Sequence, residues 1–246
     1  MTTVVETLDR IARQCSVTGP TSWITATRDT HVEIRDDFLQ ETVSDILDRL
    51  DLPGPIGKST TLVGGAGTTN ADGSETFLLP TDFLRMQRGE LAVYDQQQDR
   101  PAVPVSEDGQ WSYLTDLGAA GVVKYYRTRG YEGAYEVDVY DALGTGRELT
   151  VHYIADAWMA TSAGVVGNML TAEGDVLILP RRVVEAGTVW RFRERRGLPY
   201  QDKYNETELL MSRLSNDSRN RRVVNMGGRE QTVRWQDLVP DFIPSS

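Results

Sequence analysis

The sequence predicts an α+β protein in which helical segments from both ends of the chain form one bundle and the middle forms a β domain. Apolar residues recur at three- and four-residue steps before residue 55 and after residue 175, as in amphipathic helices. Between these regions apolar and polar residues alternate in short runs. We therefore expect a helical bundle at 1–55 and 175–222, an inserted antiparallel β domain at 59–155, and an extended C-terminal arm at 223–246.

Two helices are expected near the N-terminus. Residues 3–14 have helical spacing, and a longer helix is expected from His31 to Leu50, where Pro53-Gly54-Pro55 closes it. The exposed face of the longer helix carries five acids: Asp36, Asp37, Glu41, Asp45 and Asp48. This acidic face is either solvated or paired with basic residues of the same chain or of a neighbouring copy.

The middle of the chain predicts a small antiparallel sheet or barrel. A stretch rich in Gly and Thr at 56–75 predicts an exposed loop. After it the period changes to two, in short runs separated by turn residues. The runs are ETFLLP, ELAVYD, RPAVPVS, QWSYLTD, GVVKYYRTR, AYEVDVYD and ELTVHYIA. Because polar residues alternate along them, each sheet is expected to have one wet face.

Residues 179–214 predict two helices in an antiparallel hairpin. Pro180 is expected at the first helical position, and Gly197 lies just beyond the last apolar residues, where helices often end. Val183 and Trp190 fall on the apolar stripe of the first helix, and we expect both in the core. The stripe of the second helix is made by Tyr204, Thr207, Met211 and Leu214.

Arginines are unusually dense on the first helix of the hairpin, and a further basic cluster follows the second. The C-terminal arm holds large apolar side chains but has Gly227-Gly228 at its base and two prolines, so it is expected to bury them on a partner and to order on assembly. Together these features predict an interface with a partner protein or with another subunit. The candidate interface residues are Arg191, Arg193, Arg195, Arg196, Arg219, Arg221, Arg222, Trp235, Leu238, Phe242 and Ile243.

The charge is distributed unevenly along the chain. Residues 1–179 carry 13 Lys and Arg against 27 Asp and Glu, a net of −14, whereas residues 180–246 carry 13 against 9, a net of +4. The overall charge of −10 argues against a general nucleic-acid binder. The polarity suits head-to-tail contact between copies, and an acidic wall suits a channel through which DNA slides without sticking.

Composition and the N-terminal stretch bear on the cellular compartment in which the protein is made. An apolar fraction of 39% excludes a wholly disordered chain, and no apolar run is long enough to span a membrane. The N-terminal stretch lacks the apolar segment of a signal peptide, so synthesis in the cytoplasm is expected. The single cysteine, Cys15, permits no internal disulfide and is expected to be a small core residue.

No catalytic, cofactor or metal site is expected. The run LPGPIGKS at 52–59 resembles a phosphate-binding loop, but it has Leu52 where the first Gly is needed and two prolines that remove amide donors. Lys58 is therefore expected to be an ordinary turn lysine. His31 and His152 are too far apart to suggest ligand spacing, and no nucleophile signature surrounds Cys15.

Several stretches, in their order along the chain, resemble the head-to-tail adaptor proteins of tailed bacteriophages. They are LPTDFLRMQRG at 79–89, ELTVHYIADAW at 148–158, DVLILPRRVVEAGTVWRFRERRGLPY at 175–200, a helix around Tyr204, and the basic SRNRRVVNMGG at 218–228. The similarity covers most of the chain from about residue 30 onward. It is a similarity of ordered patterns and includes no catalytic signature.

This resemblance implies a structural virion protein at the head-tail junction that forms a ring of twelve copies around a DNA channel. It implies as partners the portal protein, reached by the C-terminal segment, and a tail or nozzle protein that faces the β domain. DNA would pass through without sequence-specific binding, and no cofactor or membrane is involved. The β region cannot be matched residue by residue, which leaves the tail-side partner open.

A second function class stays open from the residues alone. The run Lys124 to Arg129 interleaves rings with cations, which could stack bases or sugars, or could be a strand with core tyrosines and solvent-facing Lys and Arg. The alternative to the adaptor is therefore a carbohydrate- or polymer-binding β module using Trp111, Tyr125 or Tyr126, or a carboxylate-pair hydrolase, carried on helices.

Overall fold

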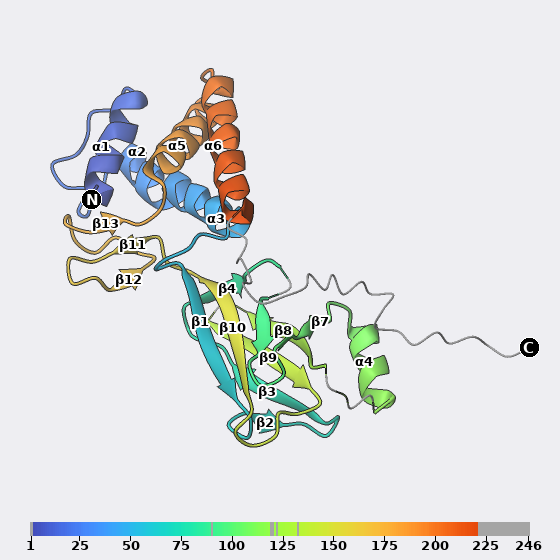
Figure 1. Cartoon of the computed structure of the whole chain (residues 1–246). Coiled ribbons are helices and arrows are strands. Elements are labelled where there is room, and N and C mark those ends of the chain that lie inside the picture. The colour runs from blue at the N-terminus through green and yellow to red at the C-terminus, as the bar shows by residue number, and fades with distance from the viewer. Residues whose placement is uncertain (1, 90, 119–120, 122, 132, 221–246) are drawn as a thin grey trace, which may run out of the picture.

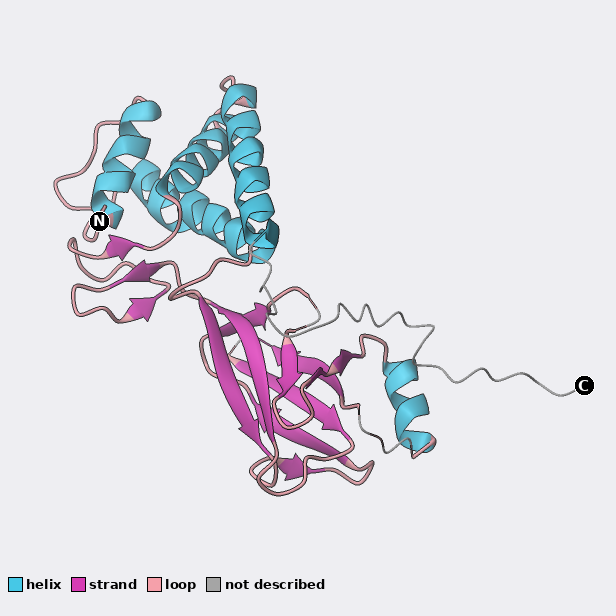
Figure 2. Ribbon diagram, viewed as in Figure 1, coloured by secondary structure: helices cyan, strands magenta, loops and turns pink. Residues whose placement is uncertain are grey.

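A computed structural model describes residues 2–89, 91–118, 121, 123–131 and 133–220, with the side chains of the last helix described as far as Ser215. The chain mixes helices with antiparallel and mixed sheets, which confirms the α+β class (Figures 1 and 2). The helices are α1 Val4–Gln14, α2 Asp29–Val32, the π-helix η1 Glu33–Phe38, α3 Leu39–Arg49, α4 Asp108–Asp116, α5 Arg181–Arg195 and α6 Gln201–Asn220.

The strands form three sheets. The first has the order β1-β10-β5-β6 with β4 also paired to β10, the second has the order β2-β3-β9-β8-β7, and a small third sheet has the order β12-β11-β13. The strands are β1 Gly57–Val63, β2 Thr68–Thr69, β3 Ser74–Leu78, β4 Phe83–Met86, β5 Val93–Asp95, β6 Arg100–Pro101, β7 Val103–Pro104, β8 Tyr125–Tyr131, β9 Ala134–Tyr140, β10 Glu148–Ala155, β11 Met159–Ala160, β12 Val166–Gly167 and β13 Val176–Leu177.

The helices other than α4 lie at one end of the molecule, and we call them, with the small third sheet, the helical part (Figure 1). Helix α5 contacts α1, η1, α3 and α6, so it lies at the centre of this group. Their shared core combines residues from both ends of the sequence, among them Leu8, Ile46, Val189 and Met211. Burying each such side chain stabilises the fold by roughly 1.5–3 kcal/mol before entropy losses.

The two larger sheets and α4 form the β-rich part at the other end (Figure 2). Strand β10 pairs along its length with β1, from Gly57 opposite Ile154 to Val63 opposite Glu148. The residues that alternate inward on the two sheets meet in one core, which includes Val151 and Leu149 from the first sheet and Val137 from the second. The outward positions on β1 are exposed, as expected for a sheet with one wet face.

Helix α5 begins and ends close to the predicted residues. Pro180 precedes the helix as its N-cap, so it stands one position earlier than expected. At the other end Gly197 adopts φ +68°, the left-handed region that glycine favours. Its N–H donates to Glu194 O at 3.0 Å and that of Leu198 donates to Arg193 O at 2.8 Å, the pairing of a Schellman motif.

One run expected to be a strand and one stretch expected to be a loop differ in the structure. The run QWSYLTD lies in helix α4, because Trp111 and Leu114, three residues apart, share one helical side and pack against Val105 and Tyr140. The expected loop at 56–75 contains strand β1, whose polar edge residues hid the alternation.

The long helix expected from His31 to Leu50 is helical as far as Arg49, with Leu50 as its C-cap, but it widens into a π-helix at Glu33–Phe38. There the N–H of Leu39 donates to Ile34 O, five residues back.

Candidate functional site

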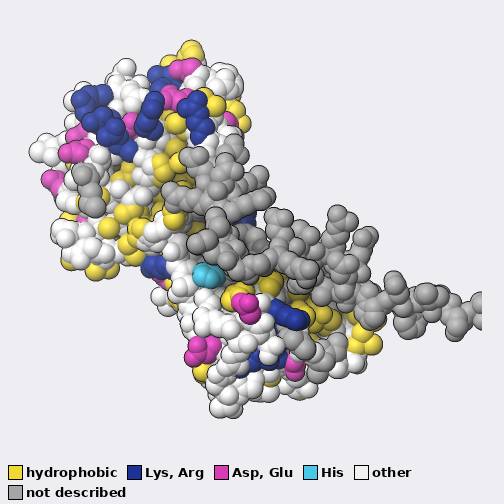
Figure 3. Space-filling view, in the orientation of Figure 1, with side chains coloured by type: hydrophobic (Ala, Val, Ile, Leu, Met, Phe, Trp, Pro, Cys, Tyr) yellow, Lys and Arg dark blue, Asp and Glu magenta, His cyan; other side chains and the backbone are white. Residues whose placement is uncertain are grey.

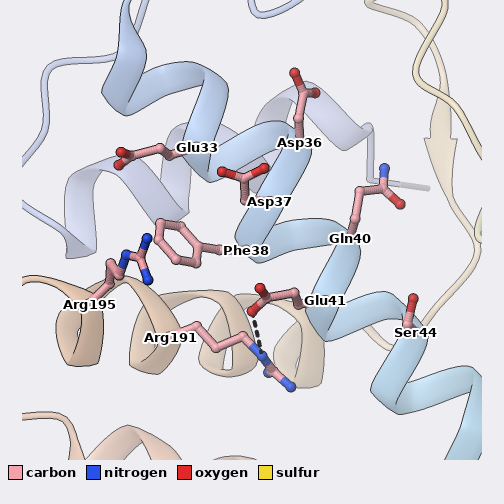
Figure 4. A pocket seen from close by; sticks show the side chains of 9 residues that line it. All are labelled: Glu33, Asp36, Asp37, Phe38, Gln40, Glu41, Ser44, Arg191 and Arg195. Atoms are coloured by element: carbon pink, nitrogen blue, oxygen red, sulfur yellow. Dashed lines mark ion pairs between the residues drawn. The ribbon is translucent and has the colours of Figure 1, made fainter.

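A groove of about 690 Å³ lies between α5 on one side and η1 with α3 on the other. Its walls have opposite charge: carboxylates line the η1 and α3 side, and arginines line the α5 side (Figure 4). The lining residues are Glu33, Asp36, Asp37, Phe38, Gln40, Glu41, Ser44, Arg191 and Arg195. A second hollow of about 510 Å³ lies beside the groove and shares Asp36 and Gln40 with it.

The π-helix η1 supplies much of the acidic wall. Its wider turn brings Glu33, Asp36 and Asp37 to the groove while Ile34 and Phe38 remain buried. Short π-helical turns inside α-helices are frequent at functional sites, which supports this groove as the candidate site. Nothing in the sequence pattern distinguished these residues from an ordinary acidic helix face.

Arg191 is held inside the chain rather than offered to a partner. Its side chain is only 12% exposed and lies 3.2 Å from Asp45 and 3.6 Å from Glu41. The guanidinium also donates to Thr42 Oγ1 at 3.2 Å and stacks 4.4 Å from the centre of the Trp190 ring. The acidic face of α3 is therefore paired, in part, with the arginine helix of the same chain.

Arg193 and Arg196 also have partners within the chain. Arg196 forms an ion pair with Glu33 at 2.6 Å and lies over the ring of Phe192. Arg193 lies 3.4 Å from Asp202 at the start of α6. Each pair has an exposed or half-exposed member, so solvent screens it and its net contribution to stability is small. These contacts bridge α5 to η1 and to α6.

Arg195 is the candidate that remains accessible. Its side chain is exposed, and among the described residues no ion-pair partner is found for it. Figure 4 shows it beside Phe38 at one end of the groove. Asp37, also exposed, lies on the facing wall without an ion pair in the described part of the chain. A partner carrying both charges could pair with these two groups.

Trp190 does not lie in the core as predicted. It is half-buried between α5 and α6, edge-on to Tyr204 with ring centres 5.4 Å apart, and its indole N–H has no hydrogen-bond partner among the described residues. The buried ring of α5 is Phe192, which packs edge-on against Phe38 at 6.1 Å. The rest of the expected stripe is buried as predicted, with Val183, Ala186 and Gly187 facing the core.

The remaining interface candidates cannot be placed in the same way. Arg219 lies within α6, beyond the residues whose side chains are described. The others fall outside the described residues, as does the whole predicted arm at 223–246. They are Arg221, Arg222, Trp235, Leu238, Phe242 and Ile243.

The other titratable residues singled out in the sequence have structural surroundings. His31 is buried, with Nε2 2.8 Å from Thr18 O and its ring edge-on to Trp23. Cys15 is buried, and burial raises the pKa of its thiol to about 11. Lys58 is a residue of β1 and not of a turn, and it forms an ion pair with Asp82.

Of the three aromatic residues considered for stacking, two are buried and the third, Tyr125, is half-buried against the cluster of Val105, Trp111 and Tyr140. Trp111 is 3% exposed and Tyr126 is 6% exposed, so neither presents a face on which a sugar or base could stack. Lys124, expected to face solvent, is 3% exposed and forms an ion pair with Asp141 at 2.6 Å. It is buried because it anchors the end of β9, where Asp141 has a left-handed backbone.

A group of residues that the sequence pattern did not reveal joins the two parts of the molecule. Arg85, from β4, donates to Leu47 O at 2.9 Å and Leu50 O at 3.0 Å, and it forms an ion pair with Asp51 at 2.7 Å. Arg88 donates to the carbonyls of Asp48 and Arg49. We call these two arginines and the end of α3 the joint. The motif LPTDFLRMQRG contains both arginines, but local sequence does not indicate the distant carbonyls.

Metal binding, membrane crossing and similarity to known proteins give little further information about the function. In the part of the chain that the structure describes, no three His, Cys, Asp or Glu side chains group as metal ligands. No helix among those residues has the length and apolar character needed to cross a membrane. No protein-family model matches the sequence, and no curated protein matches it.

Proposed function

We propose that this protein is a structural subunit of a ring that joins the portal of a tailed-phage capsid to the tail and lines the DNA channel. In this proposal both ends of the chain build a helical bundle, the β domain is an insertion, and residues 223–246 are an arm that reaches the portal. The ring has twelve copies and lies at the head-tail junction of the virion. Its other partner is a tail or nozzle protein, and DNA passes without sequence-specific binding.

One observation supports this proposal most directly: two of the stretches that resemble adaptor proteins, 79–89 and 148–158, meet where the two parts of the molecule are joined. The stretch at 79–89 contributes Arg85 and Arg88 to the joint, and β4 within it pairs with β10 of the stretch at 148–158. The stretch at 175–200 supplies the central helix α5. The shared patterns therefore correspond to scaffolding that positions two units, as expected in an assembly protein.

The surface of the helical part is consistent with docking by charge. On the face seen in Figure 3, Lys and Arg side chains gather over the helices. Arg10 and Arg181 both lie near the single carboxylate of Glu185, at 3.9 and 3.4 Å, so this cluster keeps an excess positive charge. Arg182 is 73% exposed and lies 3.9 Å from Glu206, which is already paired with Lys203. Exposed cations with weak internal pairs favour an acidic protein partner.

The alternative functions have less support. A glycan-binding platform at Trp111, Tyr125 or Tyr126 is disfavoured because Trp111 and Tyr126 are buried and Tyr125 is half-buried. A carboxylate-pair hydrolase would need acids free to act on a substrate. In the groove, however, Glu33, Asp36 and Glu41 are each paired with an arginine of the same chain.

The mass of the protein in solution, alone and mixed with portal rings, tests the proposal. We expect rings with a central channel by negative-stain electron microscopy, either for the free protein or on addition of portal. A protein that stays monomeric and leaves portal rings bare at micromolar concentration would contradict the adaptor function. A monomer that binds glycan instead would support the alternative.

Arg195→Glu tests whether the arginine helix contributes to the interface. Because Arg195 is exposed and has no ion pair among the described residues, its replacement should change the unfolding free energy by less than about 0.5 kcal/mol. We expect weaker ring formation or portal binding, by roughly tenfold if a charge pair is lost. Arg100→Glu, at an exposed position of β6 in the β-rich part, is the matched control. Equal effects of the two variants would remove Arg195 from the interface.

A further inference from the structure

The two backbone connections between the parts do not fix their relative orientation. Side-chain contacts must therefore contribute to it. The backbone crosses at residues 50–57, between α3 and β1, and returns at 155–159, between β10 and β11. The first crossing contains Pro53, Gly54 and Pro55, all exposed, and Gly54 has φ +83°. An exposed turn of this kind does not by itself hold a β domain at one angle to a helix.

Ile154 and Leu84 of the β-rich part pack against the core of the helical part, and the joint adds directional hydrogen bonds to these apolar contacts. The last carbonyls of a helix lack partners within the helix and carry the negative end of its dipole. In α3 these carbonyls accept hydrogen bonds from the β-rich part: Arg85 binds those of Leu47 and Leu50, and Arg88 binds those of Asp48 and Arg49, at 2.7–3.2 Å. The Arg85 side chain is 19% exposed, so water competes weakly for its donors.

Arg49 links the same helix end to α6. While its carbonyl accepts from Arg88, its guanidinium makes two hydrogen bonds of 2.7 Å to the two carboxylate oxygens of Glu208. The hydrogen bond to Arg49, aided by the charges of Arg49 and Arg191, lowers the pKa of Glu208 below its ordinary value. One residue therefore contacts α6 through its side chain and the β-rich part through its backbone.

The pairs continue from Arg49 into the groove. Asp45 lies 3.6 Å from Arg49 and 3.2 Å from Arg191, so α3 is connected in one row of charges to both α5 and α6. A bidentate pair fixes the direction of a guanidinium as well as its position. Loss of Glu208 therefore removes the link to α6, leaves Arg49 paired with Asp45 alone, and loosens the last turn of α3, whose carbonyls the β-rich part holds.

We infer that Arg49 couples α6 to the β-rich part, so that the pairing of Arg49 with Glu208 determines how firmly the joint holds. This device is independent of the proposed adaptor function. It acts within one chain and requires no ring or portal. Through it, a partner that displaces α6 changes the orientation of a β domain that it does not touch.

Amide hydrogen exchange of the full chain tests the coupling. Two backbone N–H groups report on the joint: that of Leu50 donates to Ile46 O at 2.9 Å, and that of Arg88 donates to Asp51 Oδ2 at 3.2 Å. Glu208→Gln keeps the shape of the side chain and removes its charge. We expect exchange at both amides to accelerate by about tenfold, while amides of the paired strands β5 and β10 stay protected.

Two further variants make the result decisive. Glu206→Gln is the matched control, because Glu206 lies on the same helix with the same 35% side-chain exposure but pairs with Lys203 and Arg182. We expect no acceleration in this variant. Arg85→Gln removes the Arg85 contacts of the joint directly and sets the acceleration against which the Glu208→Gln result is compared.

Three outcomes overturn the inference. If Arg85→Gln leaves both amides slow, these contacts do not hold the joint. If Arg85→Gln accelerates exchange and Glu208→Gln does not, the joint exists but α6 is not coupled to it. If Glu206→Gln and Glu208→Gln accelerate exchange equally, the effect belongs to α6 as a whole and not to its pair with Arg49.

Discussion

Arginines of α5 in the helical part connect helices by pairing with partly exposed acids, whereas several carboxylates in the β-rich part are buried and hold loops. Arg191 and Arg196 pair with acids of α3 and η1 that are partly or largely open to solvent. In contrast, Glu75 is 1% exposed and accepts from the N–H groups of Gly65, Gly67 and Leu143. The difference teaches where single charges matter: exposed pairs orient elements at little net gain, whereas a buried carboxylate is costly to remove.

The largest predicted effect concerns the buried carboxylate of Glu75. Glu75→Gln should lower the free energy of unfolding by about 3–5 kcal/mol, because an amide cannot satisfy three backbone donors and places its own NH₂ against one of them. Chemical denaturation measures this loss. Glu136→Gln is the control, because Glu136 is 35% exposed and forms an ion pair with Arg129 at 3.3 Å. Similar losses in both variants would erase the contrast between buried and exposed carboxylates.

Unfolding at alkaline pH tests each part through one buried side chain whose pKa is raised. Burial raises the pKa of Cys15, in the helical part, from 9.0 to about 11. Burial and the hydrogen bond to Asp82 raise the pKa of Tyr153, in the β-rich part, from 10.0 to about 12. A raised pKa means that the unfolded chain loses its proton first as the pH increases. The stability linked to Cys15 is therefore fully present below pH 9 and is lost as the pH rises to about 11.

The measurement compares the wild type with Cys15→Ala from pH 8 to 11. The wild type should lose roughly 2–3 kcal/mol more of its unfolding free energy over this range, since a tenfold change in an acid dissociation constant corresponds to about 1.4 kcal/mol. Cys15→Ala lowers the starting stability but should flatten this part of the curve. Parallel curves for the two proteins would show that the thiol does not titrate differently in the folded state.

The smallest predicted effect concerns the close contact of α3 with α5. A Cβ added at Gly187 would overlap Cγ2 of Thr42. Gly187→Ala should therefore cost about 1 kcal/mol net, because overpacking of roughly 1–3 kcal/mol exceeds the helix-propensity gain of about 1 kcal/mol.

Thr42→Ser provides the rescue for this variant. The serine removes the clashing methyl and keeps the hydroxyl that donates to Phe38 O at 2.7 Å. In the Thr42→Ser background Gly187→Ala should be neutral or stabilising, as measured by thermal melting. If the cost of Gly187→Ala persists there, the strain lies in the backbone of α5 rather than at Thr42.

Sequence periodicity anticipated the helices better than the sheets, for a local reason. The sequence predicts the C-terminal end of α5 correctly because Gly197 and the arginines before it act within one turn of the helix. Strand β1 was read as a loop because its pairing with β10 connects residues about 90 positions apart, which no local pattern records. The same limit applied to QWSYLTD, where packing against Tyr140 decided between a helix and a strand.

The candidate site was anticipated only in part. An acidic face from Asp36 to Asp48 and a basic helix were both visible in the sequence, and their pairing within the chain was one of the open alternatives. Which arginine is used internally and which remains free depends on the direction of each side chain around α5. Arg191 turns toward α3, and Arg195 lies one turn further on, beside Phe38 at one end of the groove.

The sequence by itself determined the α+β class, the positions of most helices and the uneven distribution of charge. These follow from residue spacing and from composition, which act over a few neighbouring positions. Only the tertiary structure decided that η1 is a π-helix, that Trp190 lies between α5 and α6, and that Arg85 and Arg88 bind the end of α3. Those features depend on carbonyls, rings and carboxylates far apart along the chain, which come together only when the helical and β-rich parts pack.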